Sequence, residues 1–505
     1  GRRAGPRAAL ILAAASPLVD YAIGIWPHAI SLALVTGAAW ALAVSVRDDR
    51  PLLALLAGAL LGAAINARVD ALFAWPALVL WTLAMARRVP VTLLALAAGA
   101  VPFLLLASWA NLAKWGDFSP ISYGPATAHH ASSFLQPLYI AGAAVAVALA
   151  LAVRSPALGA FAAARPRAVL AAGVGLVAAA ILLLPPLRTL AGELLWGAWV
   201  LGVNFQAYTR ADASPGILAD ANGLLVFWGI HKKALTQSLP WIGLAIAALP
   251  LLARREGARG AAFCLLPIGL WLFPFARTEW HGGLSASMRY LLPVVPYLAI
   301  LAALGWARLA RDAGEIRLPR VLILALAAVL AVGVAPGLAL GREAWSAIVQ
   351  AYGTLALAAV VAALTLAALV QARFARAACH AALVAYTAAG VIAYGYDLGV
   401  NQERRNFAER VAAGSRGLPP EALVVAHDPA HHLEKMVEDR GAVATLAPAQ
   451  ELVAAVDRAL AEGRPVYVQE FGLRDAILAA RPGLAAVPAE GRDTSTELFR
   501  IEVRE

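Results

Sequence analysis

The stretch EWHGGLSASMRYLLPVVPYLA, residues 279–299, joins two kinds of sequence. Its first half carries an acid, a tryptophan, a histidine, two adjacent glycines and an arginine. Its second half is an apolar run with the composition of a membrane-spanning helix. The polar half therefore marks one end of a predicted span, and the side of the membrane that it faces decides what it can bind.

The rest of the chain has the same membrane character. Of its 505 residues, 61% are hydrophobic and 14% are charged, whereas a soluble domain has about 45–50% apolar and about 25% charged residues. We predict a mostly α-helical, polytopic transmembrane bundle of about 11 to 13 spans. The net charge is +10, but arginine lies mainly in short loops between apolar runs. This distribution indicates helix orientation and argues against nucleic-acid binding.

Apolar runs long enough to be considered as spans recur along the chain. They cover residues 8–24, 27–46, 51–66, 70–86, 90–110, 138–153, 168–185, 239–253, 260–276, 290–307, 321–340, 345–370 and 377–397. Because backbone polar groups must be satisfied within lipid, all of them are expected to be helical.

The distribution of Lys and Arg orients the spans. With a cytoplasmic N-terminus, the short arginine-rich loops, such as 47–50, 87–88 and 308–320, all lie inside, as the positive-inside rule requires. The stretch 279–289 and the long loop 186–238 then face outside. In that loop the spacing of two tryptophans predicts an amphipathic helix, which either lies in the membrane interface or packs on the bundle.

From about residue 400 the chain becomes more polar and alternates between strand and helix patterns. The expected strands are ALVVAH, GAVATL, PVYVQE, LAAVPAE and ELFRIEV, with helices between most of them. We predict a transmembrane domain over residues 1–400 and a small α/β domain with a largely parallel sheet over residues 401–505, outside the membrane. The segment HDPAHH, residues 427–432, is interpreted as a helix N-cap followed by proline, in preference to a metal site.

Ionisable residues at membrane depth are costly and indicate function. The predicted topology brings several of them to the outer face from separate segments. An arginine fork suits phosphate oxygens, and a tryptophan ring suits a sugar or an apolar chain. The predicted substrate-binding residues are Arg289, His281, Arg68, Asp70, His28, Glu279, Trp280 and Tyr123. Two alternatives stay open: an Arg68–Asp70 ion pair that only caps a turn, and an Arg289 that only begins a span.

Two parts of the chain resemble a known family. SPLVDYAIGIWPHAISLALVTGAAWALAV (16–44), followed by LLAGALLGAAINARVDALFAWPALVLW (55–81), resembles integral-membrane glycosyltransferases of the GT-C fold, the protein-O-mannosyltransferase-like and aminoarabinose-transferase-like enzymes of bacteria. WHGGLSASMRYLLPVVPYLA (280–299) is similar to the later W-x-G-G…R-Y-L-x-P-x-x-P segment of such proteins. A small extracytoplasmic domain after the last helix is also common in them.

The resemblance implies an activity and a location. Such enzymes transfer one sugar from a polyprenyl-phosphate donor to a lipid, glycan or protein acceptor on the outer face of the bacterial inner membrane. Some use a divalent ion, Mg²⁺ or Mn²⁺, and the alternative is no cofactor. Their catalytic carboxylate lies in the first outer loop, which we expect upstream of Gly1 in a longer protein. The chain as given is therefore expected to be inactive, and Asp20 is only a weak candidate for the acid.

Three other classes of protein compete with this interpretation. A transporter or lipid flippase has broken helices and internal repeats, but no clear repeat is visible in the sequence. An O-antigen-ligase-like enzyme depends on a large outer loop rich in Arg and His, and the loop 186–238 is modest in both. A structural membrane module has no need of polar residues from several segments on one face.

Overall fold

The computed structural model divides into two compact units, Gly1–Leu398 and Gly399–Glu505. The residues that it describes, apart from a few single positions, are 4–14, 16–18, 27–121, 137–155, 164–209, 217–219, 223–227, 230–253, 255–280, 288–313, 352–370, 418–425, 443–444, 449–469, 473–489 and 498–503. The predicted spans 321–340 and 377–397 lie outside these residues.

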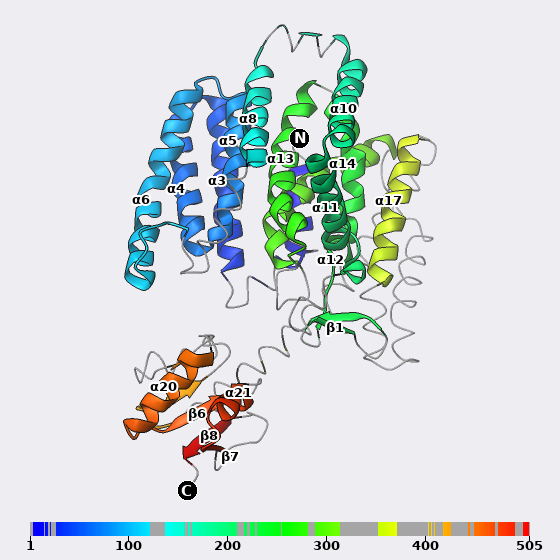
Figure 1. The fold of residues 1–505 in the computed structure, drawn as a ribbon. Helices are drawn as coiled ribbons and strands as arrows, with labels where there is room; N and C mark the ends of the chain where they lie inside the picture. Colours follow the sequence, from blue (N-terminus) through cyan, green and yellow to red (C-terminus); the bar gives the residue numbers. More distant parts are fainter. Residues whose placement is uncertain are drawn as a thin grey trace. The chain divides into compact units, whose positions relative to one another are not determined.

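The first unit is a helical bundle (Figure 1). Its α-helices are α1 (Ala4–Ala14), α3 (His28–Asp48), α4 (Pro51–Ala67), α5 (Ala74–Met85), α6 (Val89–Trp115), α8 (Pro137–Ala152), α10 (Pro166–Leu183), α11 (Pro185–Gly202), α12 (Leu235–Ser238), α13 (Arg255–Thr278), α14 (Val295–Ala313) and α17 (Thr354–Val370). Its 3₁₀ helices are η1 (Val69–Phe73), η3 (Phe205–Ala207), η5 (Pro240–Ala253) and η6 (Arg289–Val294). The predicted mostly α-helical fold is confirmed.

Three helices in the described part of the chain are long and apolar enough to cross a membrane: His28–Asp48, Val89–Ala113 and Arg289–Leu309. Several shorter apolar helices accompany them, including Pro51–Ala67 and Thr354–Val370. Lipid offers no partner for backbone polar groups, so an apolar chain of this kind satisfies them within helices. The first unit is therefore an integral membrane domain.

Glycines allow α4 and α6 to pack with their backbones in contact. A Cβ atom at Gly58 would collide with the carbonyl of Leu96, and one at Gly99 would collide with the carbonyl of Leu55. In Figure 1 these two helices lie side by side. Small residues at helix interfaces give membrane bundles the close van der Waals contact that the hydrophobic effect cannot supply in lipid. The pairing of residues shows that α4 and α6 run in the same direction.

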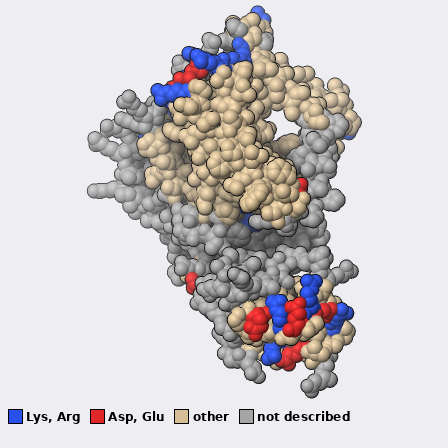
Figure 2. Space-filling model, turned by 90° about the vertical axis from the view of Figure 1, so that its left-hand side faces the viewer, with Lys and Arg blue, Asp and Glu red and all other residues tan. Residues whose placement is uncertain are grey.

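Arginine-rich turns gather at one end of the bundle. Arg88 Nε lies 3.2 Å from Asp49 Oδ2, so the turn between α3 and α4 contacts the turn between α5 and α6. Arg154 Nη1 donates to the carbonyl of Ala86 at 2.6 Å, which brings the turn after α8 to the same place. Figure 2 shows charged groups collected at this end of the first unit, whose described surface is otherwise largely uncharged in that view. We call the turns 47–50, 86–88 and 153–155 the arginine end; they are all turns predicted to be cytoplasmic.

The long loop 186–238 is more structured than the sequence predicts. It holds most of α11, η3, the short antiparallel sheet β1 (Ile217–Ala219), β2 (Leu225–Phe227) and β3 (Ile230–His231), and α12. Helices α10 and α11 meet at a bend of 108°. A Cβ at Gly197 would collide with the backbone of α13 at Ala276, while Trp196 and Trp199 are 41% and 46% exposed. The amphipathic segment is therefore a helix with one face packed on the bundle.

Three predicted spans differ from expectation in their local geometry. The run 8–24 gives a helix that ends at Ala14, ahead of Pro17. The run 239–253 is a 3₁₀ helix with Pro250 inside it, and the span beginning at residue 290 opens with the 3₁₀ helix η6, which contains Pro293. Proline has no N–H to donate to the preceding turn and clashes with its carbonyl, so regular α-helix is interrupted at such positions.

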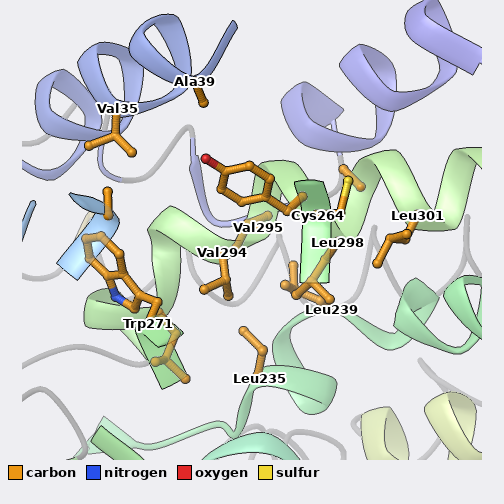
Figure 3. Close-up of a cluster of buried hydrophobic side chains, with 14 of the residues drawn as sticks. Val35, Ala39, Leu235, Leu239, Cys264, Trp271, Val294, Val295, Leu298 and Leu301 are labelled. Atoms are coloured by element: carbon orange, nitrogen blue, oxygen red, sulfur yellow. The ribbon is translucent and has the colours of Figure 1, made fainter. Parts of the chain in front are cut away.

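The core of the bundle lies next to the ends of α3 and α13 that carry the predicted site. Figure 3 shows side chains from α3, the end of α12, α13, η6 and α14 meeting in it. They are Val35, Ala39, Leu235, Leu239, Cys264, Trp271, Val294, Val295, Leu298 and Leu301. Close packing of this kind fixes the helix ends that carry polar residues.

The second unit is an α/β domain with α20 (Ala449–Ala461), α21 (Leu473–Ala480) and strands β4 (Leu423–Val425), β5 (Val443–Ala444), β6 (Val466–Gln469), β7 (Leu484–Pro488) and β8 (Leu498–Val503). The strand order is β5-β4-β6-β8-β7. All five predicted strands are present. Both helices pack on one face of the sheet, around Val425, Val456, Val468, Ile477 and Ile501.

The sheet is mixed, so the prediction of a largely parallel sheet is wrong for two of its strands. β4 pairs in parallel with β5 and β6, but β8 is antiparallel to β6 and β7. Too few residues separate β7 from β8 for the crossover that a parallel pair needs. Hydrogen bonds from Arg481 join the two helices and hold the pKa of Asp457 below its usual range. The segment HDPAHH lies outside the described residues.

Candidate functional site

A largely buried ion pair lies at the end of the bundle opposite the arginine end. Helix α4 stops at Ala67, and Arg68 takes an extended conformation before η1 begins. Arg68 Nε donates to Asp70 Oδ1 at 2.9 Å, and Nη2 donates to Oδ2 at 2.7 Å. The two side chains are only 13% and 11% exposed. This fork-to-fork geometry is the strong form of an Arg–carboxylate pair. The ion pair that the sequence left open as an alternative is therefore present.

The same guanidinium also binds the first residue of α3. Arg68 Nη1 lies 2.6 Å from Nε2 of His28. His28 is buried, with 4% of its surface exposed. A guanidinium has donors and no acceptor, so the histidine nitrogen must accept this hydrogen bond. The ring of Tyr21 lies 5.2 Å from that of His28. Arg68 therefore links the segment before α3 to the turn after α4.

Tyr290 joins this network to the stretch 279–289. The guanidinium carbon of Arg68 lies 4.8 Å from the centre of the Tyr290 ring, and that of Arg289 lies 5.4 Å from it. His28 meets the same ring edge-on at 6.1 Å, and Trp280 does so at 6.2 Å. A cation over an aromatic face is attracted by its quadrupole. Two arginines from distant segments are thus held against one ring.

The backbone around this ring is held in place from α13. Trp271, which is fully buried, donates from Nε1 to the carbonyl of Tyr290 at 2.7 Å. Helix α13 ends at Thr278, and Glu279 turns the chain with φ of 50° while remaining buried. A non-glycine residue in this region costs about 1–3 kcal/mol, and such strain is concentrated at functional sites. Trp280 follows and is 46% exposed.

Replacing Trp271 with phenylalanine should lower the thermal unfolding midpoint of the protein in detergent. The variant keeps an aromatic ring against Phe73 but removes the donor to the Tyr290 carbonyl. The loss of one such hydrogen bond costs about 1 kcal/mol. An unchanged midpoint would contradict the role assigned to this bond.

The structure brings together most of the predicted residues that it describes. His28, Arg68, Asp70, Trp280 and Arg289 all contact one another directly or through Tyr290. Glu279 lies next to Trp280 in the chain and is buried. His281, Tyr123 and Asp20 lie outside the described residues. Whether these side chains bind substrate stays a prediction.

We call the grouping the Tyr290 cluster; its members are Tyr21, His28, Arg68, Asp70, Trp280, Arg289 and Tyr290. Tyr290 is not among the residues predicted from the sequence, although the R-Y-L-x-P pattern contains it. A tyrosine at the start of an apolar run has the appearance of an interface anchor. Only the fold places its ring between the segments.

Chemically, the Tyr290 cluster offers cationic donors beside aromatic faces. Asp70 is bound by Arg68 on both oxygens, so it is poorly available to a metal ion. Among the described residues, no group of three or more His, Cys, Asp and Glu could hold a metal. The cluster therefore does not fit a divalent ion, and it fits an anionic group attached to an apolar or sugar moiety better.

No family model matches the sequence, and no curated protein matches it. Two crystal structures of ArnT from Cupriavidus metallidurans are similar, one in the apo state and one bound to undecaprenyl phosphate. Each is 14% identical, with 99% of this chain and 92% of that chain covered, at TM-scores of 0.35 and 0.36.

Proposed function

We propose that the protein is a membrane glycosyltransferase of the GT-C type. It would move a sugar from a polyprenyl-phosphate donor to a lipid, glycan or protein acceptor at the outer face of a bacterial inner membrane. One observation carries the proposal: the segments on which the resemblance rests, 16–44, 55–81 and 280–299, all contribute residues to the Tyr290 cluster.

In this proposal the two arginines have different tasks. Arg289 binds the lipid phosphate, because guanidinium donors match phosphate oxygens. Arg68 is committed to Asp70 and His28 through three of its five N–H groups, so it mainly holds the cluster together. Trp280, with its exposed ring, faces the sugar or the first isoprene units.

The reaction would be a displacement at the anomeric carbon of the donor sugar. An acceptor hydroxyl forms the new C–O bond, the bond from the sugar to the phosphate oxygen breaks, and the polyprenyl phosphate leaves. A base takes the proton of the acceptor hydroxyl. We assign that base to none of the described residues, because Asp70 is already neutralised by Arg68.

Removing the guanidinium of Arg289 should lower sugar transfer roughly 10- to 100-fold, since a hydrogen bond to a charged group contributes about 1.5–3 kcal/mol. The protein, expressed from its complete gene, would be assayed in proteoliposomes with a panel of labelled polyprenyl-phosphate sugars. Arg47→Ala is the matched control, because Arg47 lies at the arginine end and pairs with Asp48. Full transfer by Arg289→Ala would contradict the proposal.

A lipid flippase is the second candidate, and the 108° bend between α10 and α11 favours it. Broken helices near the midplane are common in transporters. The same proteoliposomes distinguish the two functions. Movement of the lipid-linked sugar across the bilayer without transfer to any acceptor would favour the flippase.

A further inference from the structure

The arginine end carries more positive charge than its aspartates neutralise. Arg47 pairs with Asp48 at 2.7 Å, and Arg88 pairs with Asp49 at 3.2 Å. Both aspartates are thereby engaged. All of these residues lie in turns that end apolar helices, at the level where lipid headgroups meet a membrane domain.

Three further arginines share this end. Arg50 and Arg87 are exposed, and neither forms a salt bridge with any acid among the described residues. Arg154 donates through Nη1 to the carbonyls of Ala86 and Leu83, at 2.6 and 3.1 Å, which fixes its guanidinium beside the turn that holds Arg87. The contact between Arg88 and Asp49 brings Arg50 to the same place.

Apolar side chains stand directly next to these charges. Leu52 in the first turn of α4 is 80% exposed, and Leu94 in α6 is 70% exposed. Val91, in the first turn of α6, is also exposed. Helices α4 and α6 run in parallel with their backbones in contact, so both carry exposed apolar side chains just beneath the arginine end.

We propose that Arg50, Arg87 and Arg154 bind the phosphate headgroup of an anionic phospholipid, with Leu52, Val91 and Leu94 against its acyl chains. The arginines supply charge and forked donors for phosphate oxygens. The exposed apolar side chains beneath them favour a lipid over a soluble phosphate. Basic sites between helices on the cytoplasmic side are suited to anionic headgroups, whose attraction is worth about 1 kcal/mol for each basic residue. This site is independent of the Tyr290 cluster.

The test is native mass spectrometry of the detergent-solubilised protein titrated with phosphatidylglycerol or with phosphatidylethanolamine of the same acyl chains. We expect Arg50→Gln/Arg87→Gln to weaken phosphatidylglycerol binding roughly 30-fold, about fivefold for each charge. Binding of phosphatidylethanolamine should not change. Arg188→Gln, at an exposed arginine in the first turn of α11, is the control and should leave both lipids unaffected.

Two further measurements distinguish a loss of lipid binding from a change in the orientation of the helices. Arg50→Lys/Arg87→Lys preserves the charge that orients the helices, and it should show an intermediate loss because lysine lacks the fork. Labelling of an introduced cysteine on each side of the membrane checks that the topology is unchanged. The proposal is overturned if the glutamine variant binds phosphatidylglycerol as tightly as the control does. Displacement of that lipid by inorganic phosphate alone would also overturn it.

Discussion

Replacing Asp70 with alanine is expected to destabilise the membrane domain by about 3–5 kcal/mol, because it leaves the Arg68 guanidinium buried without its carboxylate. The thermal unfolding midpoint in detergent should fall substantially. The substitution should also disturb the packing of His28 and Tyr290, because Arg68 contacts both of them.

The matched control is Asp48→Ala at the arginine end. Asp48 also pairs with an arginine, but the Arg47 side chain there is 71% exposed. Exposed pairs contribute about 0–1 kcal/mol, so this variant should be nearly neutral. If both variants lower the midpoint equally, the Arg68–Asp70 pair does not have the energetic role that its burial implies.

Replacing Gly99 with leucine should have an effect of comparable size. Any Cβ at this position collides with the carbonyl of Leu55, which is backbone and cannot move aside as a side chain would. Helices α4 and α6 would have to separate, and overpacking costs typically 1–3 kcal/mol and sometimes more. We expect a loss of at least about 3 kcal/mol, measured as reduced thermal stability and reduced yield of folded protein.

Gly175→Leu provides the control for this substitution. Gly175 also lies within an apolar helix, but a Cβ there meets nothing within 4 Å. Leucine favours helix over glycine, so the control should be neutral or slightly stabilising. Gly58→Leu acts on the same interface from the other side. The double variant with Gly99→Leu should therefore lose less than the sum of the single losses.

Local patterns in the sequence predicted the elements well where length and apolarity decide them. The run 27–46 became His28–Asp48, and the run 51–66 became Pro51–Ala67. In the second unit each predicted strand is present. The relative direction of the strands was harder to predict, because it depends on which strands become neighbours. The antiparallel pair β7 and β8 is an example.

The predictions that failed concern non-local contacts. The sheet β1-β2-β3 consists of strands of two or three residues, too short to show the alternation that marks a strand. Tyr290 was not selected because its importance comes from Arg68, which lies far away in the chain. The grouping of polar residues at one end of the bundle could be predicted, because charge distribution fixes the sides of a membrane protein. The individual partners of these polar residues could not be predicted.

The most direct test of the account is a binding titration of undecaprenyl phosphate, carried out with excess phosphatidylglycerol to occupy the arginine end. Wild-type protein and Arg47→Ala should bind one molecule with equal affinity. Arg289→Ala should bind it roughly 10- to 100-fold more weakly, as expected for the loss of a charged hydrogen-bond donor. Equal affinity in all three proteins would contradict the assignment of the lipid phosphate to the Tyr290 cluster.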